Sequence, residues 1–510
     1  MFSPAIFALL VVFAYIAARL RSRDGIRKSP PGPKGLPFIG NALQIPNDRQ
    51  WLTWEQWRRD YGDIIQITVL GQPNIILSSL KAANDLLETR GNVYSDRPGA
   101  VMAGELVGWN RGLGYSPYHS PRFREFRRLF QQFIGPRACI EKEMRETLER
   151  ENLRLIVKLL EDPKQFAEYA RDSPSSTILL LSYGYSTHMG DPLHLVKIAE
   201  EAMSGFALAS EPGRWWVDSF PILKHVPGAS FKRTAAKMRQ DLDKLYDVPY
   251  EYVKRKLVNG APISSFVSTY LDEKESTSVT PTLTEQDDEL VKAFAASLYS
   301  GGAETSPSAI ISFILAMCMY PDVQARAQAE IDKYLADEGK VLPSLEDRDK
   351  VELEYVMGVM LEVWRWNPSV PLGLPHLATQ DDVYNGYFIE KGTVVWANIW
   401  SILHDEELFP NPFEFKPERY ISNPKAKEAV GVAFGFGRRL CPGVHLAEHS
   451  IWLFIATALA VFEFKFPDQK KQEVEYHGFI SHPSPFSCDI KPRNKEIGGH
   501  VKSRLENLDV

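Results

Sequence analysis

The chain has 510 residues, of which 44% are hydrophobic, 24% charged and 11% aromatic. These proportions fit a folded globular protein and exclude disordered, collagen-like and polytopic membrane classes. The 59 Lys and Arg residues against 65 Asp and Glu give a net charge of −6, so we expect no nucleic-acid partner. The four cysteines form no C-x-x-C pair, which argues against a zinc knuckle or a disulfide framework and favours reduced thiols in a cytosol-facing protein.

The N-terminus carries an uncharged apolar run over residues 2–18, and basic residues follow it from Arg19 to Lys28. The run is long enough to span a bilayer, and positive charge on its downstream side alone places that side in the cytosol. A cleaved signal peptide is the alternative, but its positive charge would precede the apolar run. We therefore predict a single transmembrane anchor over residues 1–20, an extended, basic and Pro-rich hinge over 21–45 that holds the body off the membrane, and a body over 46–510.

The body is predicted to be mainly α with small β-sheets. Residues 64–78 read as a hairpin around Gly71, and Asn385-Gly386 suits the type I′ turn of a second hairpin, with a further turn at Gly392. Most of the remainder has helical periodicity, which is clearest over 147–161, 230–256, 321–337 and 353–366. The polar, Ser/Thr-rich stretch 272–283 is predicted to be a mobile surface loop.

One predicted helix is unusually long, because Thr284 can cap its start and Pro321 ends it. Such a helix would cross the whole fold through its core. Its middle, SGGAETSPSA, is nevertheless poor helix material, and such a local conflict often marks a functional site. Pro307 cannot donate to the carbonyl of Ala303, so we expect the helix to open beside Thr305.

A Gly-rich loop near the C-terminus delivers Cys441 immediately before a strongly apolar helix. The helix N-terminus and the arginines at 438–439 are expected to favour a thiolate there. The alternative is an inert buried cysteine, the commonest fate of a lone thiol. A dinucleotide site at Gly435 and Gly437 is a weaker interpretation, because Leu440 replaces the third glycine and no βαβ unit surrounds it.

This loop resembles the haem-binding loop of the cytochrome P450 family. The pattern F-x-x-G-x-R-x-C-x-G is met by Phe434, Gly437, Arg439, Cys441 and Gly443. Three further family motifs follow the family's order: G-G-x-E-T at 301–305, E-x-x-R at 362–365 and P-E-R at 417–419. The resemblance covers essentially the whole chain and implies the cytochrome P450 fold, with a long central helix over a haem b.

The resemblance implies roles for individual residues. Cys441 would be the axial ligand, since a thiolate pushes electron density onto haem iron and promotes O–O cleavage, and Phe434 and Gly437 would contact the haem. Glu362 and Arg365 share a helix face and with Arg419 would form a buried, structural charge network. An ordinary surface pair at this spacing is the alternative.

Glu304 and Thr305 resemble the family's acid and alcohol pair, which relays protons to iron-bound dioxygen. The alternative for Thr305 is a hydroxyl bonded to its own helix carbonyl. Cations for the haem propionates are expected from Arg127, His376 and Arg439. Arg127 stands where the family often has Trp-x-x-x-Arg, but Phe123 replaces the Trp, and His376 could equally be a satisfied loop histidine.

The pocket walls are carried over by segment only. They would comprise the region after Arg97, the GRWWVDSF stretch, the long helix around Phe294 and Leu298, and residues 370–374 and 478–480. These segments are apolar and aromatic, which favours an uncharged, hydrophobic organic substrate. Trp215 and Trp216 would line the pocket, or would pack in the core or against a membrane.

The resemblance implies an NADPH- and dioxygen-dependent monooxygenase that hydroxylates or epoxidises its substrate. Electrons would come from a separate NADPH-cytochrome reductase, and the catalytic domain would face the cytosol from the endoplasmic reticulum membrane. The loop and hinge resemble those of fungal enzymes of secondary metabolism and xenobiotic oxidation. The rivals are a haem-thiolate isomerase or dehydratase, which needs no proton relay, and a non-catalytic membrane haem sensor.

Overall fold

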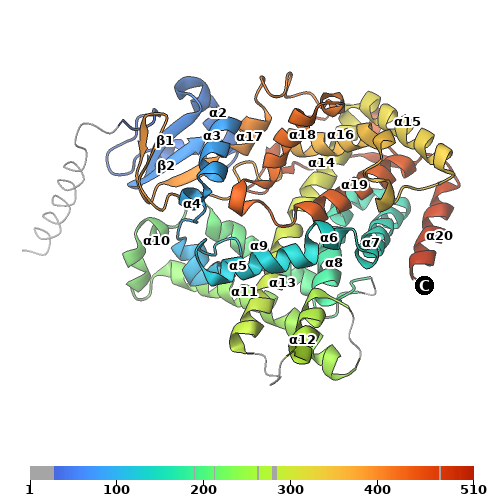
Figure 1. The fold of residues 1–510 in the computed structure, drawn as a ribbon, viewed down its shortest axis with the longest axis horizontal. Coiled ribbons are helices and arrows are strands. Elements are labelled where there is room, and N and C mark those ends of the chain that lie inside the picture. Colours follow the sequence, from blue (N-terminus) through green and yellow to red (C-terminus); the bar gives the residue numbers. More distant parts are fainter. Residues whose placement is uncertain are drawn as a thin grey trace, which may run out of the picture.

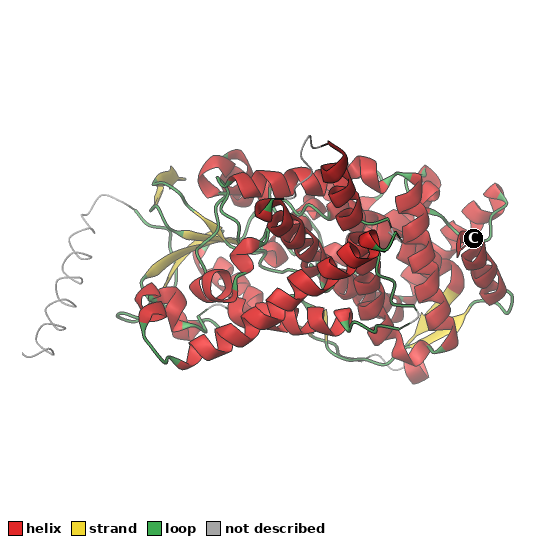
Figure 2. Cartoon of the chain, turned by 90° about the horizontal axis from the view of Figure 1, so that it is seen from below, coloured by secondary structure: helices red, strands yellow, loops and turns green. Residues whose placement is uncertain are grey.

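The computed structural model describes residues 28–188, 190–211, 213–260, 264–277, 284–469 and 472–509. The predicted membrane anchor over residues 1–20 lies outside these ranges. The protein is mainly helical with small sheets, as predicted, and the sheet that contains β1 and β2 lies at one end of the molecule (Figures 1 and 2). The longer helices are α2 (Gln50–Tyr61), α5 (Pro121–Ile134), α7 (Lys142–Glu161), α8 (Phe166–Tyr183), α9 (Leu195–Ser210), α11 (Ser230–Val258), α12 (Phe266–Thr277), α13 (Glu285–Gly302), α14 (Thr305–Met319), α15 (Pro321–Glu338), α16 (Glu354–Trp366), α19 (Val444–Val461) and α20 (Ile497–Asp509).

The largest sheet has the strand order β1-β2-β6-β3. Its first two strands, β1 (Ile64–Val69) and β2 (Gln72–Leu77), form the predicted hairpin, and Leu70 and Gly71 turn the chain with positive φ. Strand β6 (Val394–Ala397) runs parallel to β2, and β3 (His376–Leu377) pairs with the other side of β6. The sheet thereby places residue 376 beside a segment that is distant in the sequence.

Three two-stranded sheets complete the β structure of the described chain. Strands β4 (Asp382–Tyr384) and β5 (Tyr387–Ile389) form the second predicted hairpin, and its turn residues Asn385 and Gly386 have φ of 48° and 76°. Both values are those that a type I′ turn requires. Near the C-terminus β7 (Phe462–Lys465) pairs with β10 (Asp489–Pro492), and β8 (Tyr476–His477) pairs with β9 (His482–Pro483).

The Pro-rich part of the predicted hinge lies against the largest sheet and does not stand free of it. The backbone N–H of Gln66 in β1 donates to the carbonyl of Pro31 at 2.9 Å. A Cβ atom at Gly32 would overlap the carbonyl of Gln66, so glycine permits this close approach. Further along, the side chain of Asn41 accepts from the N–H of Thr68 at 2.9 Å. The described part of this segment is therefore an edge of the body.

The predicted helices are present, and one predicted loop is wrong in part. Helix α12 continues through residues 272–277, which the composition assigned to a mobile loop. Its buried face is Val267, Tyr270 and Leu271, and Lys274 on the next turn reaches Asp287 of α13 at 2.7 Å. This ion pair between neighbouring helices is a contact that polar composition does not reveal. Residues 278–283 lie outside the described ranges.

The long central helix is broken in the middle, as Pro307 predicts. Thr284 accepts from the N–H of Asp287 at 3.2 Å and caps α13, which ends at Gly302, and α14 begins at Thr305. The segment 285–319 and helix α19 are long and apolar enough to cross a membrane, but both are largely buried inside the protein. They are core helices, and the break between α13 and α14 lies in the interior of the helical part (Figure 1).

Helix α16 approaches the short helix η9 (Pro417–Tyr420) so closely that the contact leaves no room for a side chain at Gly358. A Cβ atom at Gly358 would lie 2.8 Å from the carbonyl oxygen of Pro417. We expect Gly358→Ala to lower the thermal midpoint, because overpacking of about 1–3 kcal/mol outweighs the helix propensity gained. Gly499→Ala on α20, where nothing lies within 4 Å, should leave the midpoint equal or higher. An unchanged midpoint for Gly358→Ala would contradict the packing described.

Candidate functional site

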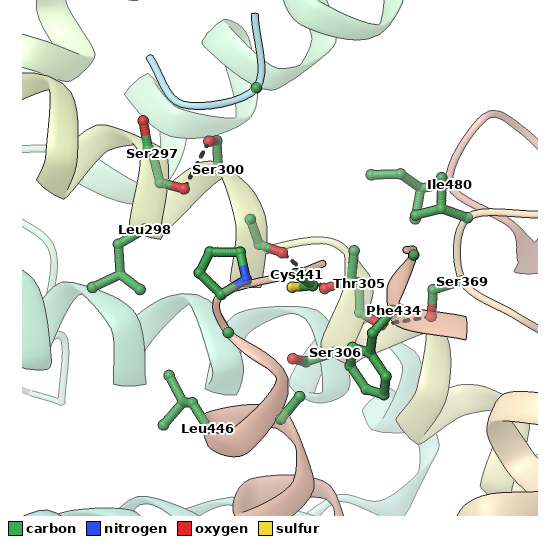
Figure 3. A pocket seen from close by; sticks show the side chains of 18 of the residues that line it. Ser297, Leu298, Ser300, Thr305, Ser306, Ser369, Phe434, Cys441, Leu446 and Ile480 are labelled. Carbon is green, nitrogen blue, oxygen red and sulfur yellow. Dashed lines mark hydrogen bonds between the residues drawn. The ribbon is translucent and has the colours of Figure 1, made fainter. Parts of the chain in front are cut away.

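An internal cavity of about 420 Å³ lies beside the break between α13 and α14. Thr305 from the start of α14, Ser369 from the loop after α16 and Cys441 from the C-terminal loop surround the same space (Figure 3). Residues of α5, α8 and α9 complete its walls. The motifs singled out in the sequence at 301–305 and 434–443 thus meet at one site.

Cys441 lies in the loop between η11 (Gly437–Arg439) and α19. Its backbone N–H donates to the carbonyl of Phe434 at 2.8 Å, which closes the loop under the thiol. Phe434 packs edge-on against Trp364 of α16, with ring centroids 4.9 Å apart. Gly437 has φ of 49°, and a Cβ atom there would lie 2.5 Å from the carbonyl oxygen of Leu87. The loop therefore requires glycine at 437.

The electrostatic setting of Cys441 differs from the predicted one. Burial raises the pKa of the thiol, while the N–H of Gly443 and the charge of Arg127 oppose that rise. The guanidinium groups of Arg438 and Arg439 are directed elsewhere: Arg438 donates to the hydroxyl of Tyr118, and Arg439 donates to the carbonyls of Ser95 and Ser116. The expectation that these two arginines favour the thiolate is wrong. A bound metal ion would supply the missing positive charge.

Arg97 and Arg439 lie close together at the edge of the cavity. Arg97 donates to the carbonyls of Leu374 and Pro375, each at 2.7 Å, and its Nε has no hydrogen-bond partner among the described residues. Burial, followed by the charge of Arg439, lowers the pKa of Arg97 to about 9. Burial likewise lowers the pKa of Arg439 to about 10. Two guanidinium groups thus face one interior space.

Arg97 was not predicted as a functional residue, since no sequence motif distinguishes it from the other arginines of the chain. Arg439, in contrast, was predicted. It donates to the carbonyl of Ser95 through Nε and to that of Ser116 through Nη2, each at 2.7 Å. Its guanidinium also lies over the ring of Phe123, 4.1 Å from the centroid. These contacts fix the direction of the group.

The other two predicted cations, Arg127 and His376, also line the cavity. Arg127 donates to the carbonyl of Leu440 at 2.7 Å and so ties α5 to the loop of Cys441. His376 Nδ1 donates to the carbonyl of Tyr94 at 2.7 Å. Burial and the charges of Arg97 and Arg439 hold the pKa of His376 well below its usual range. The imidazole is therefore neutral, and its Nε2 is left as an acceptor.

These cations fit the haem that the motif implies. No salt bridge to Arg97, Arg127 or Arg439 occurs within the described ranges of the chain. Charged groups left unpaired in an interior are costly. A haem carries two carboxylates at one edge, and these would compensate Arg97 and Arg439. A neutral His376 has no N–H left to donate to a carboxylate, because its Nδ1–H already donates to Tyr94.

Thr305 and Glu304 occupy the break between the two central helices. The hydroxyl of Thr305 donates to the carbonyl of Gly301 at 2.8 Å, which is the arrangement expected of a helical threonine. Its oxygen can still accept a second hydrogen bond from the cavity side. The carboxylate of Glu304 does not line the cavity and lies 3.4 Å from Nε2 of His482. The structure brings both residues to the break.

Glu362, Arg365 and Arg419 form one network between α16 and η9. Arg365 is bidentate to Glu362, with donor–acceptor distances of 2.7 and 2.9 Å, and Arg419 Nε donates to the same carboxylate at 3.1 Å. The hydroxyl of Tyr420 and the backbone N–H of Lys416 also donate to it. Glu362 and Arg365 have no exposed side-chain surface, so the surface-pair alternative is excluded.

The walls of the cavity are mostly apolar, and no Asp or Glu is among them in the described chain. The predicted wall segments at 370–374 and 478–480 contribute, as does Leu298. Residues of the GRWWVDSF stretch and Phe294 do not line the cavity, so those predictions are wrong: Trp216 is 62% exposed, and Phe294 packs against Phe130 and Phe266. Trp109 and Phe206, 4.8 Å apart and edge to face, supply aromatic surface in their place.

The charge network under the site generates a test. We expect Glu362→Gln to cost about 3–5 kcal/mol of stability, because it leaves two buried guanidinium groups without their counter-charge. The thermal midpoint and the yield of folded protein measure this loss. Asp332→Asn, which removes one partner of the surface pair with Arg493, is the matched control and should cost about 1 kcal/mol or less. Equal losses in both variants would contradict the role of burial.

Comparisons with known proteins agree with this geometry. Residues 30–490 match the family described as "Cytochrome P450". The chain is 41% identical to "Cytochrome P450 monooxygenase 208" of Postia placenta over 96% of this chain and 95% of the relative. It is 38% identical to "Tryptamine 4-monooxygenase" of Psilocybe cyanescens over 92% of this chain and 95% of the relative. The chain therefore belongs to the cytochrome P450 monooxygenase family, whose members bind haem with an axial cysteine thiolate.

Proposed function

We propose that this protein inserts one atom of dioxygen into an uncharged, hydrophobic organic substrate by hydroxylation or epoxidation, with Cys441 as the axial haem ligand. The observation that carries the proposal is the meeting of Cys441 with the break at Thr305 around one apolar cavity (Figure 3). When bound there, the haem supplies the activation of dioxygen. The remaining steps belong to side chains of this chain.

Two groups of residues would hold the haem: cations that bind its propionates, and the loop that carries Cys441. Arg97 and Arg439 would bind the propionates, and Arg127 would contribute through the loop it stabilises. His376 would bind a propionate only when protonated, because the Nδ1–H of the neutral ring already donates to Tyr94. Phe434 and Gly437 shape the loop that would hold the haem. The network of Glu362, Arg365 and Arg419 fixes α16 behind Phe434 and has a structural role.

Protons for the reaction pass through the helix break. The hydroxyl group of Thr305 donates its proton to the carbonyl of Gly301. Its oxygen can still accept a hydrogen bond from a donor in the cavity. Glu304, whose side chain is 36% exposed, connects this point with solvent. Apolar walls exclude bulk water, so proton delivery depends on these two side chains.

The substrate is neutral. A protonated amine would find no carboxylate on the described cavity walls, where guanidinium groups are the charged side chains, and an unpaired buried charge is costly. One relative is named for tryptamine, an amine, and the composition of these walls argues against the same substrate here. Trp109 and Phe206 favour a compound with a ring or an extended apolar skeleton.

NADPH, through a separate NADPH-cytochrome reductase, supplies the electrons, and the protein is anchored in the endoplasmic reticulum membrane with its catalytic domain in the cytosol. The apolar run at residues 2–18 and the basic residues after it support the anchor. Exposed apolar side chains at Trp216, Phe220 and Ile222, on and beside α10 (Trp216–Ser219), support membrane contact. The chain is similar to fungal monooxygenases, and a role in secondary metabolism or xenobiotic oxidation is part of this proposal.

The test compares wild type with Cys441→His. Wild type reduced with dithionite and exposed to carbon monoxide should give the strongly red-shifted Soret band of a thiolate-bound haem, and the variant should lose it. With ¹⁸O₂, NADPH and the reductase, wild type should place one labelled atom in a neutral aromatic or terpenoid compound that binds the cavity. A variant that keeps the red-shifted band would overturn the assignment of Cys441. Turnover without incorporation of the label would overturn the monooxygenase reaction.

A further inference from the structure

The imidazole of His482 faces Glu304 at the helix break. His482 lies on β9, and its Nε2 is 3.4 Å from Oε2 of Glu304. Both ring nitrogens are shielded from solvent, yet neither makes a hydrogen bond within the described chain. A polar group buried without a partner is costly. Glu304 is therefore the group placed to satisfy this ring.

The backbone next to His482 is held firmly. The carbonyl of Ser481 accepts from the hydroxyl of Ser308 in α14 at 2.6 Å, and its N–H donates to the carbonyl of Ser369 at 2.8 Å. The hydroxyl of Ser481 donates to Oδ1 of Asn367 at 2.9 Å. These contacts tie the β8–β9 hairpin to the helix that begins beside Glu304. The ring is thus presented from a fixed support.

The same segment is coupled to the cavity. Ser369, which accepts from Ser481, donates through its hydroxyl to the carbonyl of Thr305 at 3.1 Å. Phe479 and Ile480, just before Ser481, line the cavity wall. The hairpin therefore connects the substrate side of the site with the solvent side, where the carboxylate of Glu304 lies.

Other carboxylates lie near Glu304. Burial raises the pKa of Glu200 on α9, and the carboxylates of Asp172 on α8 and Glu304 raise it further, while Arg171 opposes them. The carboxylates of Glu304 and Glu200 therefore repel each other. Among the described residues, His482 is the one cation-capable side chain within 4 Å of it.

We propose that His482 is a positioning residue that holds the carboxylate of Glu304 at the helix break, one residue from Thr305. This inference rests on the proposed role of Glu304 in proton delivery. His482 acts through Glu304 and does not touch the substrate, since it is not part of the cavity wall. Without it, the carboxylate turns away from the break, and proton delivery to the cavity slows.

The first test measures the contact itself in the full-length holoenzyme. Thermal midpoints of His482→Ala, Glu304→Ala and the double variant form a cycle, and we expect the two single changes to be non-additive. His477, the register partner of His482 across the hairpin, contacts Asp48 at 2.7 Å and serves as the matched control. His477→Ala should add to Glu304→Ala without coupling. Additivity for His482 as well would overturn the proposal.

The second test measures proton delivery without any substrate. With NADPH, the reductase and dioxygen, one NADPH and one proton reduce dioxygen to hydrogen peroxide, whereas two NADPH and two protons reduce it to two water molecules. Poor proton delivery favours peroxide. We expect Glu304→Gln to slow water formation roughly a hundredfold and His482→Ala to slow it roughly tenfold, as a misplaced group does. His482→Gln, which keeps an N–H donor, should restore most of the rate, and His477→Ala should not change it.

The outcomes separate the two proposals. No effect of Glu304→Gln would show that the proposed relay is wrong. A clear effect of Glu304→Gln with none from His482→Ala would overturn the positioning role alone. If His482→Ala lost its haem, His482→Leu, which fills the volume without a polar atom, would replace it in both tests. Failure of His482→Gln to restore water formation would likewise contradict positioning by a hydrogen-bond donor.

Discussion

The structure depends on how the buried charges around one cavity are neutralised. Arg97 and Arg439 face the same interior space without an ion pair to a carboxylate in the described chain, and the charge of Asp96 only partly offsets their burial. Cys441 adds a thiol whose pKa burial raises. A protein interior does not tolerate such groups unless something neutralises them. A haem would do so at both places, because its propionates would pair with the guanidinium groups and its iron would take the thiolate. The fold therefore reaches its full stability only with the cofactor.

Two structural features on opposite sides of the cavity support this arrangement. Glu362 collects hydrogen bonds from Arg365, Arg419 and Tyr420, which fixes α16 and through Trp364 the ring of Phe434. A buried ion network of this kind contributes more to one defined geometry than to net stability. On the opposite side, the interrupted central helix brings Thr305 to the cavity and leaves Glu304 at the solvent side. The charge network around Glu362 and the break between α13 and α14 together define the space in which the reaction takes place.

Local signals in the sequence predicted the local features well. The cap at Thr284, the Asn385-Gly386 turn and the break before Pro307 follow from rules that act within a few residues. These rules do not predict contacts between residues that are far apart in the sequence. Arg97 reaches carbonyls of Leu374 and Pro375, and His482 faces Glu304, each across more than 170 positions of sequence. The folded backbone alone brings such residues together, and for the same reason the docking of Pro31 on β1 escaped prediction.

The central claim is that haem carboxylates neutralise Arg97 and Arg439. Its most direct test is the thermal midpoint of the apoprotein titrated with haem and, in parallel, with haem dimethyl ester, whose two propionates carry no charge. Haem should raise the midpoint well above the level reached with the ester, although both offer iron to Cys441. Equal stabilisation by the two compounds would show that the buried guanidinium groups do not depend on the propionates and would contradict the account.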